Sequence, residues 1–321
     1  MHFLKSASLT LLKSGFLNSY TMTNFSHWIS AARLRTLPLS LSGIILASCL
    51  AAYNGFFDLK ICVLAILTTL SLQILSNFAN DYGDGIKGTD DNNRIGPERA
   101  IQSGKISPEE MLNAMKINIL ISIGLAFFLI YSAFGVTHIV YTLIFFGLGI
   151  ASIIASIKYT VGKKAYGYKG FGDIFVFIFF GLISVIGCYV LYAKQIDHVV
   201  FLPACIIGLL SAAVLNLNNM RDIESDKASD KNTLVVKLGN QKAKQYHYFL
   251  VGTAILLSVL FGILYYTSPL NLIFVFTYIP LTLHLFRVHK NTEAKLLDPE
   301  LKKLALTTFT LAILIGIGHL L

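Results

Sequence analysis

The sequence predicts an all-α membrane protein with nine transmembrane helices in one bundle and a cytoplasmic N-terminus. Three observations support this fold class. Apolar residues make up 55% of the 321 residues and charged residues only 13%, which lies well outside the averages for soluble domains. Nine nearly uncharged stretches are each long enough to cross a bilayer as a helix. The basic residues are distributed unequally between the connections on the two sides.

The nine apolar stretches occupy most of the chain. A run of about 18 or more apolar residues can cross the hydrocarbon core as a helix. The stretches span residues 37–57, 60–79, 113–134, 138–157, 171–193, 199–217, 246–266, 269–286 and 304–321. Because only short or polar connections separate them, we expect residues 27–321 to form a single transmembrane domain.

Residues 1–26 precede this domain and are expected to be a variable leader. They mix Lys and Ser with apolar residues and contain no acidic residue. This composition fits a transit-like segment or a helix on the membrane surface. It equally fits an unstructured leader, or a start codon upstream of a protein that begins at Met22. A cleaved secretory signal is not expected, because Lys13 interrupts a short apolar run.

The positive charge predicts the orientation in the membrane. Of the 26 Lys and Arg residues, 24 lie before the first stretch or in alternate connections, and only Lys60 and Lys194 lie in the others. Basic residues accumulate on the cytoplasmic side of membrane proteins. The N-terminus and the basic connections are therefore predicted to be cytoplasmic and the C-terminus external. Since topology explains the net charge of +9, we expect no nucleic-acid partner.

Several common kinds of site have no support in the sequence. The four cysteines all lie inside the apolar stretches without a C-x-x-C pair, and the eight histidines are scattered, so neither zinc nor haem is indicated. The phosphate-binding pattern of P-loop NTPases and the dinucleotide fingerprint are both missing from the sequence. An ordinary NTPase or dehydrogenase is therefore excluded.

Two matching polar groups follow the second and sixth stretches at their cytoplasmic ends. The groups are Asn77, Asp81 and Asp84, and Asn218, Asp222 and Asp226. In each, an Asp follows the Asn by four residues and a second Asp comes three or four residues later, which predicts one helical face. Helix capping is an ordinary explanation for one such group, but two matched groups of carboxylates at a membrane border indicate function. We expect them to line one cavity.

Oxygen ligands in pairs are typical of Mg²⁺, which one or two carboxylates usually bind together with substrate phosphates. We therefore expect Asp81, Asp84, Asp222 and Asp226 to hold Mg²⁺ against a diphosphate. Basic residues in the neighbouring loops are candidates for contacting the same diphosphate. They are Lys87, Arg94, Arg99, Lys163, Lys164 and Arg221.

With these residues the chain resembles the UbiA superfamily of intramembrane aromatic prenyltransferases, whose members share a nine-helix bundle and two Asp-rich cytoplasmic motifs. The resemblance covers nearly the whole chain from about His27. Within the superfamily it is similar to the branch that acts on 1,4-dihydroxy-2-naphthoate. The segments that carry this similarity are NFANDYGDGIKGTD at 77–90, RIGPER at 94–99, QSG at 102–104, RTLP at 35–38, YGY at 166–168, NNMRD at 218–222 and KNTL at 231–234.

The resemblance implies an activity and its partners. A polyprenyl chain would pass from polyprenyl diphosphate to 1,4-dihydroxy-2-naphthoate with loss of CO₂ and diphosphate, giving demethylmenaquinol in menaquinone biosynthesis. Mg²⁺ would be the cofactor, with Asn77 and Asn218 as ligands or as orienting groups. The active site would face the cytoplasm from the bacterial inner membrane. Residues 175–180, rich in Phe, are candidates for lining the path of the prenyl tail, although packing is the commoner role of such residues.

Two alternatives remain at this point. The acceptor could be another aromatic compound such as 4-hydroxybenzoate or homogentisate. A secondary transporter is the alternative from another class. Transporter sites normally lie near the bilayer midplane at broken helices, whereas every Asp of interest here lies at the end of a stretch.

The chain departs from the superfamily's pattern at three places. The general first motif has a third Asp where this chain has Gly88, which leaves Asp90 and Asp91 as substitutes or as loop charges. The second motif usually has Gly where Asp230 stands. Residues 159–164, YTVGKK, resemble a Tyr-Pro-x-x-Lys-Arg element used for the diphosphate, without its proline and with Lys164 in place of arginine. This element adds Tyr159 to the candidate diphosphate residues.

Overall fold

The computed structural model of the chain describes residues 24–89 and 95–321, in which every regular element is helical. Nine of its helical segments are long and apolar enough to cross a membrane. The elements are α1 (Phe25–Ala32), η1 (Leu34–Thr36), α2 (Leu37–Tyr53), α3 (Leu59–Lys87), α4 (Pro108–Phe134), α5 (Ile139–Lys158), η2 (Tyr166–Lys169), α6 (Gly172–Val176), η3 (Phe177–Gly187), α7 (Cys188–Ala193), η4 (His198–Val200), α8 (Phe201–Arg221), α9 (Ile223–Ala228), α10 (Leu234–Leu264), η5 (Pro269–Thr277), α11 (Tyr278–Lys290), η6 (Ala294–Leu297) and α12 (Asp298–Leu320). The predicted fold class, a polytopic all-α protein with nine spans, is confirmed.

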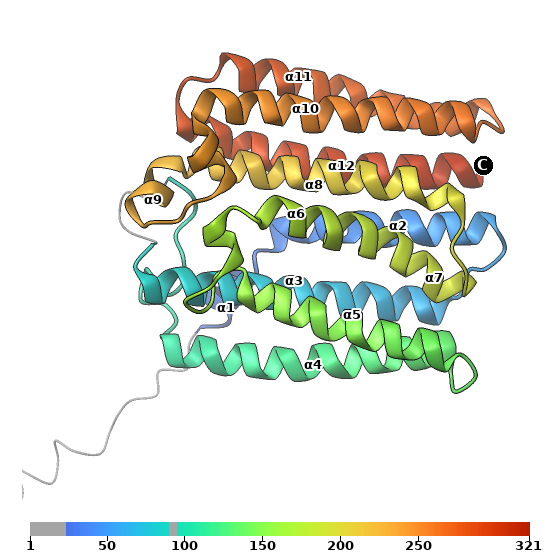
Figure 1. Cartoon of the computed structure of the whole chain (residues 1–321), viewed down its shortest axis with the longest axis horizontal. Coiled ribbons are helices and arrows are strands. Elements are labelled where there is room, and N and C mark those ends of the chain that lie inside the picture. Colours follow the sequence, from blue (N-terminus) through green and yellow to red (C-terminus); the bar gives the residue numbers. More distant parts are fainter. Residues whose placement is uncertain (1–23, 90–94) are drawn as a thin grey trace, which may run out of the picture.

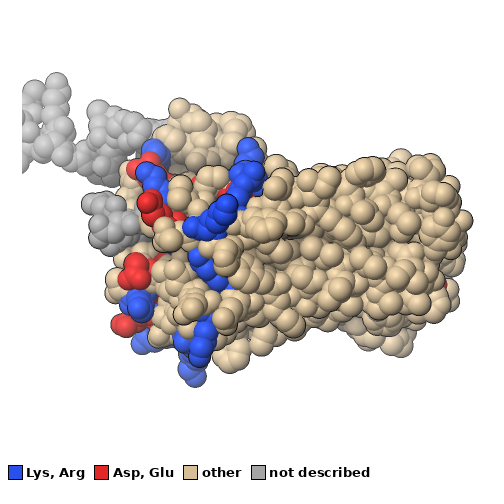
Figure 2. All heavy atoms as spheres, turned by 90° about the horizontal axis from the view of Figure 1, so that it is seen from above, with Lys and Arg blue, Asp and Glu red and all other residues tan. Residues whose placement is uncertain are grey.

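The long helices lie side by side in one bundle (Figure 1). Lys, Arg, Asp and Glu gather at one end of the molecule on the face shown in Figure 2, and the rest of that face is nearly free of them. The C-terminus lies at the end opposite α9 and the connections around it (Figure 1). Nine spans with the charged connections at one end are the arrangement that the charge pattern predicts. That the charged end is cytoplasmic stays a prediction.

Part of the sequence prediction falls on residues that the structure does not describe. The predicted leader at 1–26 is described only from residue 24 onward, and Asp90, Asp91 and Arg94 also lie outside the described residues.

At the charged end the helices extend beyond the apolar stretches. Span two ends at Lys87 instead of residue 79, and the helical segment of span seven begins at Leu234 instead of residue 246, with a kink at Gly239, whose φ is 75°. Apolarity marks the part of a helix inside the bilayer, whereas capping and backbone hydrogen bonds decide where the helix ends. The Thr233 side chain accepts a hydrogen bond from the Val236 amide to begin α10, and Gly88 ends α3 in the left-handed conformation, with φ 69°. The polar groups after span two are therefore on the helix itself.

Span five is irregular and packs closely against its neighbours. Its central segment, η3, is a π-helix of 11 residues. A Cβ atom at Gly181 would lie 2.6 Å from the Ala204 carbonyl oxygen of α8, and one at Gly43 of α2 would overlap the Ser184 hydroxyl of η3. Small residues let helix backbones approach in this way inside membranes. The glycines therefore fix span five between α2 and α8.

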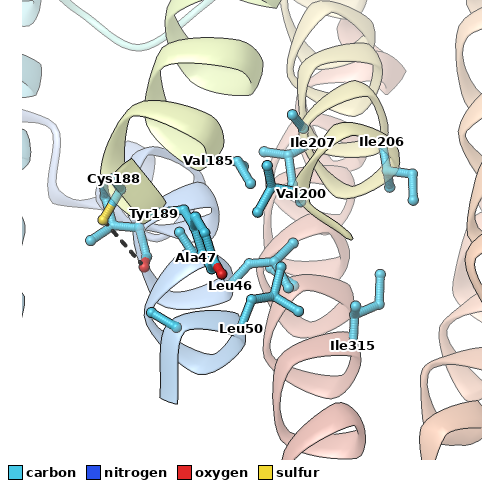
Figure 3. Packing of buried hydrophobic residues seen from close by; sticks show 14 of the residues in the cluster. Leu46, Ala47, Leu50, Val185, Cys188, Tyr189, Val200, Ile206, Ile207 and Ile315 are labelled. Atoms are coloured by element: carbon cyan, nitrogen blue, oxygen red, sulfur yellow. Dashed lines mark hydrogen bonds between the residues drawn. The ribbon is translucent and has the colours of Figure 1, made fainter. Parts of the chain in front are cut away.

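The main core lies where α2, span five, α8 and α12 meet (Figure 3). Leu46 and Leu50 of α2, Ile207 of α8 and Ile315 of α12 are each at most 1% exposed. Cys188 contributes its apolar bulk there, and its thiol makes a hydrogen bond of 4.0 Å to the Ile44 carbonyl oxygen. This core packs α8, whose end carries the second polar group, against its neighbours, while the end of α3 with the first group packs in a separate apolar cluster that includes Leu75 and Phe78.

Candidate active site

A cavity of about 420 Å³ runs from the charged end into the bundle. Its polar wall carries both charges and amides: Arg33, Arg35, Gln73, Asn77, Asn80, Asp84, Arg99, Asn218, Asn219, Lys231, Asp298 and Lys302. Deeper in the bundle the lining is apolar and comes mainly from α2, α4, α5 and span five. The shape and lining suit a ligand with a strongly charged head and an apolar body.

Aromatic side chains form part of the apolar wall. Three phenylalanines from the predicted stretch 175–180 line the cavity, namely Phe175, Phe179 and Phe180. Tyr166, in the loop after α5, stacks on Phe175 with ring centroids 3.9 Å apart and also lines the cavity. These phenylalanines therefore line the cavity, and their role along the path of a prenyl tail stays a prediction.

Asp84 is the carboxylate of the first group that faces the cavity. Its Oδ1 accepts a hydrogen bond of 2.8 Å from the Tyr168 hydroxyl, and its Oδ2 lies 3.3 Å from Nη2 of Arg99. Only 2% of Asp84 is exposed to solvent. A buried carboxylate held from two sides in this way is fixed in orientation.

Asp81 and Asn77, the other two members of the first group, form hydrogen bonds with the backbone of neighbouring segments. Asp81 accepts the backbone N–H groups of Ala100 and Ile101, at 3.0 and 3.2 Å, and lines a second pocket of about 320 Å³ instead of the cavity. The Asn77 amide donates a hydrogen bond of 2.8 Å to the Ala32 carbonyl at the end of α1, although Asn77 also lines the cavity. Both residues connect α3 to the segments that surround the cavity mouth.

In the second group the predicted common helical face is interrupted at one residue. Helix α8 ends at Arg221 and α9 begins at Ile223, so the helix is interrupted at Asp222, although the Asp222 amide still donates to the Asn218 carbonyl at 3.1 Å and the Asp226 amide to the Asp222 carbonyl at 2.9 Å. Arg221 donates from Nε and Nη2 to the two Asp222 oxygens, each at 2.7 Å, and from Nη1 to Asp298 of α12. Adjacent residues on a helix do not face each other, so the break makes this two-point contact possible. Asn218 accepts a further bond of 3.0 Å from Arg221.

Lys231 joins the two groups. Its ammonium nitrogen lies 3.3 Å from Oδ1 of Asp226 and 3.8 Å from Oδ2 of Asp84. The other Asp226 oxygen, Oδ2, is buried and has no hydrogen-bond partner among the described residues. Carboxylates that follow spans two and six are thus brought together, as predicted. The residue that joins them is a lysine, which stands out in the sequence only as part of the motif KNTL at 231–234.

Burial and the neighbouring charges act in opposite directions on the pKa values of Asp226 and Lys231. Burial raises the pKa of Asp226 to about 6, although the charge of Lys231 opposes the rise. Burial also disfavours the charged form of Lys231, but the carboxylates of Asp84 and Asp226 outweigh it and raise the lysine's pKa. At neutral pH Lys231 therefore carries its charge between two carboxylates.

Tyr159 also lines the cavity, where it would have to lie to contact a diphosphate. Burial, followed by the charge of Asp173, raises the pKa of its phenol above the ordinary value. Tyr159 is therefore a neutral hydroxyl group at neutral pH and can donate a hydrogen bond to an anion.

Most of the basic residues that were predicted to contact the diphosphate do not line the cavity. Lys87 donates a hydrogen bond of 2.6 Å to the Thr160 carbonyl, and its nitrogen lies 3.7 Å from the centroid of the Tyr168 ring. Lys163 and Lys164 are exposed and do not belong to the cavity wall. Arg99 lines the cavity, and Arg221 lines the second pocket. A diphosphate role of the three lysines stays a prediction.

The loop after α5 explains why Lys163 and Lys164 point outward. Its inward side is filled by Tyr166 and Gly167, and the Gly167 amide donates to the Tyr159 carbonyl at 3.0 Å. A Cβ atom at Gly167 would lie 2.6 Å from that oxygen. The close contact leaves no space beside Tyr159 for the longer side chains that precede it in the loop.

Asp230, whose role the sequence left open, has a backbone explanation. Its φ is +53°, in the left-handed region that glycine adopts most easily, and the residue is exposed. The conformation accounts for the glycine expected at this position. The bend that Asp230 makes is followed directly by Lys231, whose amide donates to the Asp226 carbonyl at 2.9 Å.

Sequence reasoning missed several polar residues of the cavity. Asn80 and Asn219 both line it, and Tyr168 holds Asp84. Asn80 lies four residues before Asp84, a helical spacing that would have placed both on one face. The position of Tyr168 depends on how the loop after α5 folds, and the sequence carries no signal for that.

Comparison with known proteins identifies the family. Residues 41–314 match the UbiA prenyltransferase family. The chain belongs to this family. It is 42% identical to a 1,4-dihydroxy-2-naphthoate octaprenyltransferase of Haemophilus influenzae, in an alignment that covers 92% of this chain and 96% of the relative. It is 45% identical to the enzyme of that name from Escherichia coli, over 74% of this chain and 76% of the relative.

Solved structures of UbiA-family proteins share the fold. A UbiA homologue from Aeropyrum pernix superimposes with a TM-score of 0.63 at 15% identity, covering 92% of this chain and 97% of the homologue. A homologue from Archaeoglobus fulgidus, solved with DMAPP and Mg²⁺, gives a TM-score of 0.58 at 16% identity, covering 89% and 98% of the two chains. The predicted membership of the UbiA superfamily is confirmed.

The donor atoms around the cavity of this chain suit Mg²⁺. Within the part of the chain that the structure describes, no three His, Cys, Asp or Glu side chains lie close enough to form a complete metal site. The cavity wall nevertheless carries carboxylate and amide oxygens, and Oδ2 of Asp226, whose other oxygen contacts the cavity residue Lys231, is buried without a hydrogen-bond partner among the described residues. Mg²⁺ prefers oxygen ligands and takes the remainder from water and phosphate. The residues present therefore fit the ion as a companion of a diphosphate.

Proposed function

We propose that this UbiA-family protein transfers a polyprenyl chain from polyprenyl diphosphate to 1,4-dihydroxy-2-naphthoate, releasing diphosphate and CO₂ and forming demethylmenaquinol. The single observation that carries the proposal is the cavity, whose charged wall contains Asp84, Arg99 and Lys231 and whose interior is apolar. The choice of acceptor rests on relatives with this named activity at 42% and 45% identity.

The charged wall would bind the diphosphate. Asp84 and Asp226, with Asn80 and Asn218 nearby, would hold Mg²⁺, which neutralises the negative charge that develops on the departing diphosphate. Arg99 and Lys231 would donate charge-assisted hydrogen bonds to its oxygens. Tyr168 keeps the Asp84 carboxylate in its orientation through the 2.8 Å hydrogen bond.

The reaction balances without an additional reactant. The allylic C–O bond breaks and diphosphate leaves with the bonding electrons. The ring carbon that carries the carboxylate forms the new C–C bond to the prenyl chain. The bond from that carbon to the carboxylate then breaks, CO₂ leaves, and its electron pair restores the aromatic ring. The apolar cavity wall would keep water from the allylic cation, which water would otherwise hydrolyse.

The cavity's position in the membrane suits both substrates. Phe175, Phe179 and Phe180 give the prenyl chain an apolar path inside the bundle. The end where Lys and Arg gather (Figure 2) would face the cytoplasm of a bacterium, from which an anionic acceptor enters. The protein would then act at the cytoplasmic side of the inner membrane.

The test follows the acceptor's carboxyl group. Purified protein is incubated with Mg²⁺, polyprenyl diphosphate and 1,4-dihydroxy-2-naphthoate labelled in the carboxyl carbon, and the gas is trapped. We expect labelled CO₂ and diphosphate in equal amounts, and no reaction in chelator or with Asp84→Asn. Diphosphate release with the label retained on the product would refute the proposed chemistry.

Parallel incubations separate the acceptors. A 4-hydroxybenzoate enzyme keeps the carboxylate on its product and releases no CO₂, whereas homogentisate prenylation can also lose CO₂ and is therefore distinguished by acceptor identity. Turnover of either compound, combined with none of 1,4-dihydroxy-2-naphthoate, would replace the proposed acceptor. The transferase assignment would then remain.

A further inference from the structure

We propose that Lys231 is a displaceable counter-ion, which holds the two carboxylate groups together in the metal-free protein and moves to the diphosphate when a divalent cation takes its place. The inference rests on the proposed function for the presence of the diphosphate. It assigns Lys231 a positioning role that couples metal binding to substrate binding.

The first support is that Lys231 occupies the place between the groups. Its nitrogen lies 3.3 Å from Asp226 Oδ1 and 3.8 Å from Asp84 Oδ2, and the side chain is only 11% exposed. A metal ion bound by the same two carboxylates would approach their oxygens to about 2 Å. Two cations cannot share these oxygens at such distances without strong repulsion, so a metal bound to the two oxygens that Lys231 contacts displaces the ammonium.

The second support is that the Lys231 side chain can turn into the cavity while its backbone stays fixed. Lys231 lines the cavity, so its ammonium can turn toward a ligand there. Its amide donates to the Asp226 carbonyl at 2.9 Å, and its carbonyl accepts from the Thr233 amide at 2.9 Å. Only the four-carbon stem needs to change conformation, which lysine does readily.

The third support is that Asp84 keeps its position without the lysine. The Tyr168 hydroxyl donates to Asp84, and the Tyr168 carbonyl accepts from the Asn232 amide at 3.1 Å. The loop after α5 thereby ties the first carboxylate group to the segment that carries Lys231. The two groups stay assembled when the ammonium moves.

The functional consequence is mutual dependence between metal and diphosphate. In the empty site the metal competes with Lys231 and binds weakly. Diphosphate gives the displaced ammonium a new partner, so the metal binds more tightly in its presence. By thermodynamic linkage the metal strengthens diphosphate binding by the same factor. The site would avoid holding a metal before its substrate arrives.

The test measures Mn²⁺ binding to purified protein by electron paramagnetic resonance, with and without inorganic diphosphate. We expect Lys231→Gln to bind Mn²⁺ about tenfold or more tightly than the unsubstituted protein when diphosphate is absent, and to lose most of the increase that diphosphate causes. Lys227→Gln is the matched control, because Lys227 is exposed on α9 and its loss changes the net charge equally. Its Mn²⁺ affinity should not change.

A second variant and a second measurement guard against misfolding. Lys231→Met keeps an unbranched side chain, one atom shorter, without the charge, and Mn²⁺ should raise its unfolding temperature more than that of the unsubstituted protein. Unchanged or weaker Mn²⁺ binding by Lys231→Gln, or an equal rise in unfolding temperature for Lys231→Met, would overturn the inference.

These measurements use no aromatic acceptor and no turnover. If the unsubstituted protein prenylates 1,4-dihydroxy-2-naphthoate but Lys231→Gln leaves Mn²⁺ affinity unchanged, the inference alone fails. If Mn²⁺ affinity changes as expected but no acceptor reacts, the proposed function fails and the counter-ion role stands.

Discussion

Arg221 and Asp222 are adjacent in the chain and still form a two-point ion pair, with Nε and Nη2 of the guanidinium each 2.7 Å from a carboxylate oxygen. Both residues are buried, at 2% and 7% exposure. The same guanidinium reaches Asp298, so the break between α8 and α9 is tied to α12. Asp222, which the sequence predicts as a metal ligand, therefore already has both oxygens engaged.

Asp222→Asn is expected to lower the free energy of unfolding as well as activity. It leaves the buried Arg221 charge with a neutral amide on one side, which costs about 2 kcal/mol or more. Denaturant unfolding of the purified protein in detergent measures the loss. The exposed Asp230→Asn is the control and should unfold with the same midpoint as the unsubstituted protein. A midpoint for Asp222→Asn equal to that of the control would show that the ion pair does not stabilise the fold.

Metal binding is expected to depend on pH through Asp226. In the metal-free protein its pKa is raised to about 6, so the carboxyl group is mostly protonated at pH 5.5 and ionised at pH 7.5. A divalent cation must then displace a proton at the lower pH, and its affinity should fall as the pH drops below about 6. An indicator dye in weak buffer should report proton release on Mn²⁺ addition at pH 5.5 and little at pH 7.5. Equal release at both values would contradict this assignment.

Asp230→Gly is expected to preserve activity and to stabilise the fold or leave it unchanged. The residue has φ +53°, where glycine avoids a steric cost of about 1 kcal/mol that other residues bear. Asp230→Ala keeps the cost and removes the polar side chain, so it should be the less stable of the two. Thermal unfolding compares them directly. Loss of metal binding by Asp230→Gly would instead identify the Asp230 carboxylate as a ligand.

The orientation in the membrane can be tested with reporters. A reporter fused after Leu321 should read as external, while probes placed in residues 95–105 and 225–240 should read as cytoplasmic, because 24 of the 26 basic residues lie before the first span or in alternate connections. The structure places the C-terminus and α9 at opposite ends of the bundle (Figure 1). A cytoplasmic reading after Leu321 would mean that the charged end faces outward.

The composition of the sequence and its nine long apolar stretches determined the fold class. Crossing a bilayer requires a long apolar helix with its backbone hydrogen bonds satisfied internally, so the nine spans could be counted from the sequence and were confirmed. Their ends at the charged side could not, because helices α3 and α10 continue into polar sequence. Local capping, which hydropathy does not record, decides those ends.

The motif residues also marked where the site lies. The carboxylates that follow spans two and six converge, since Asp84 and Asp226 both contact Lys231. Which members of each motif face the cavity depends on contacts that have no periodic signal. Asp81 is directed to the amides of Ala100 and Ile101, and Asp222 is directed to Arg221 by a break in the helix.

The sequence by itself determined the family, the number of spans and which two spans end in carboxylate groups. Each of these depends on residues close together in the chain. Only the tertiary structure decided that Lys231 lies between Asp84 and Asp226, that Tyr168 orients Asp84, and that Lys163 and Lys164 face away from the cavity. These positions depend on packing between segments distant in sequence, chiefly the loop after α5 against the end of α3 and the turn after α9. Contacts of this kind follow from the shape of the assembled bundle, which no local pattern of residues specifies.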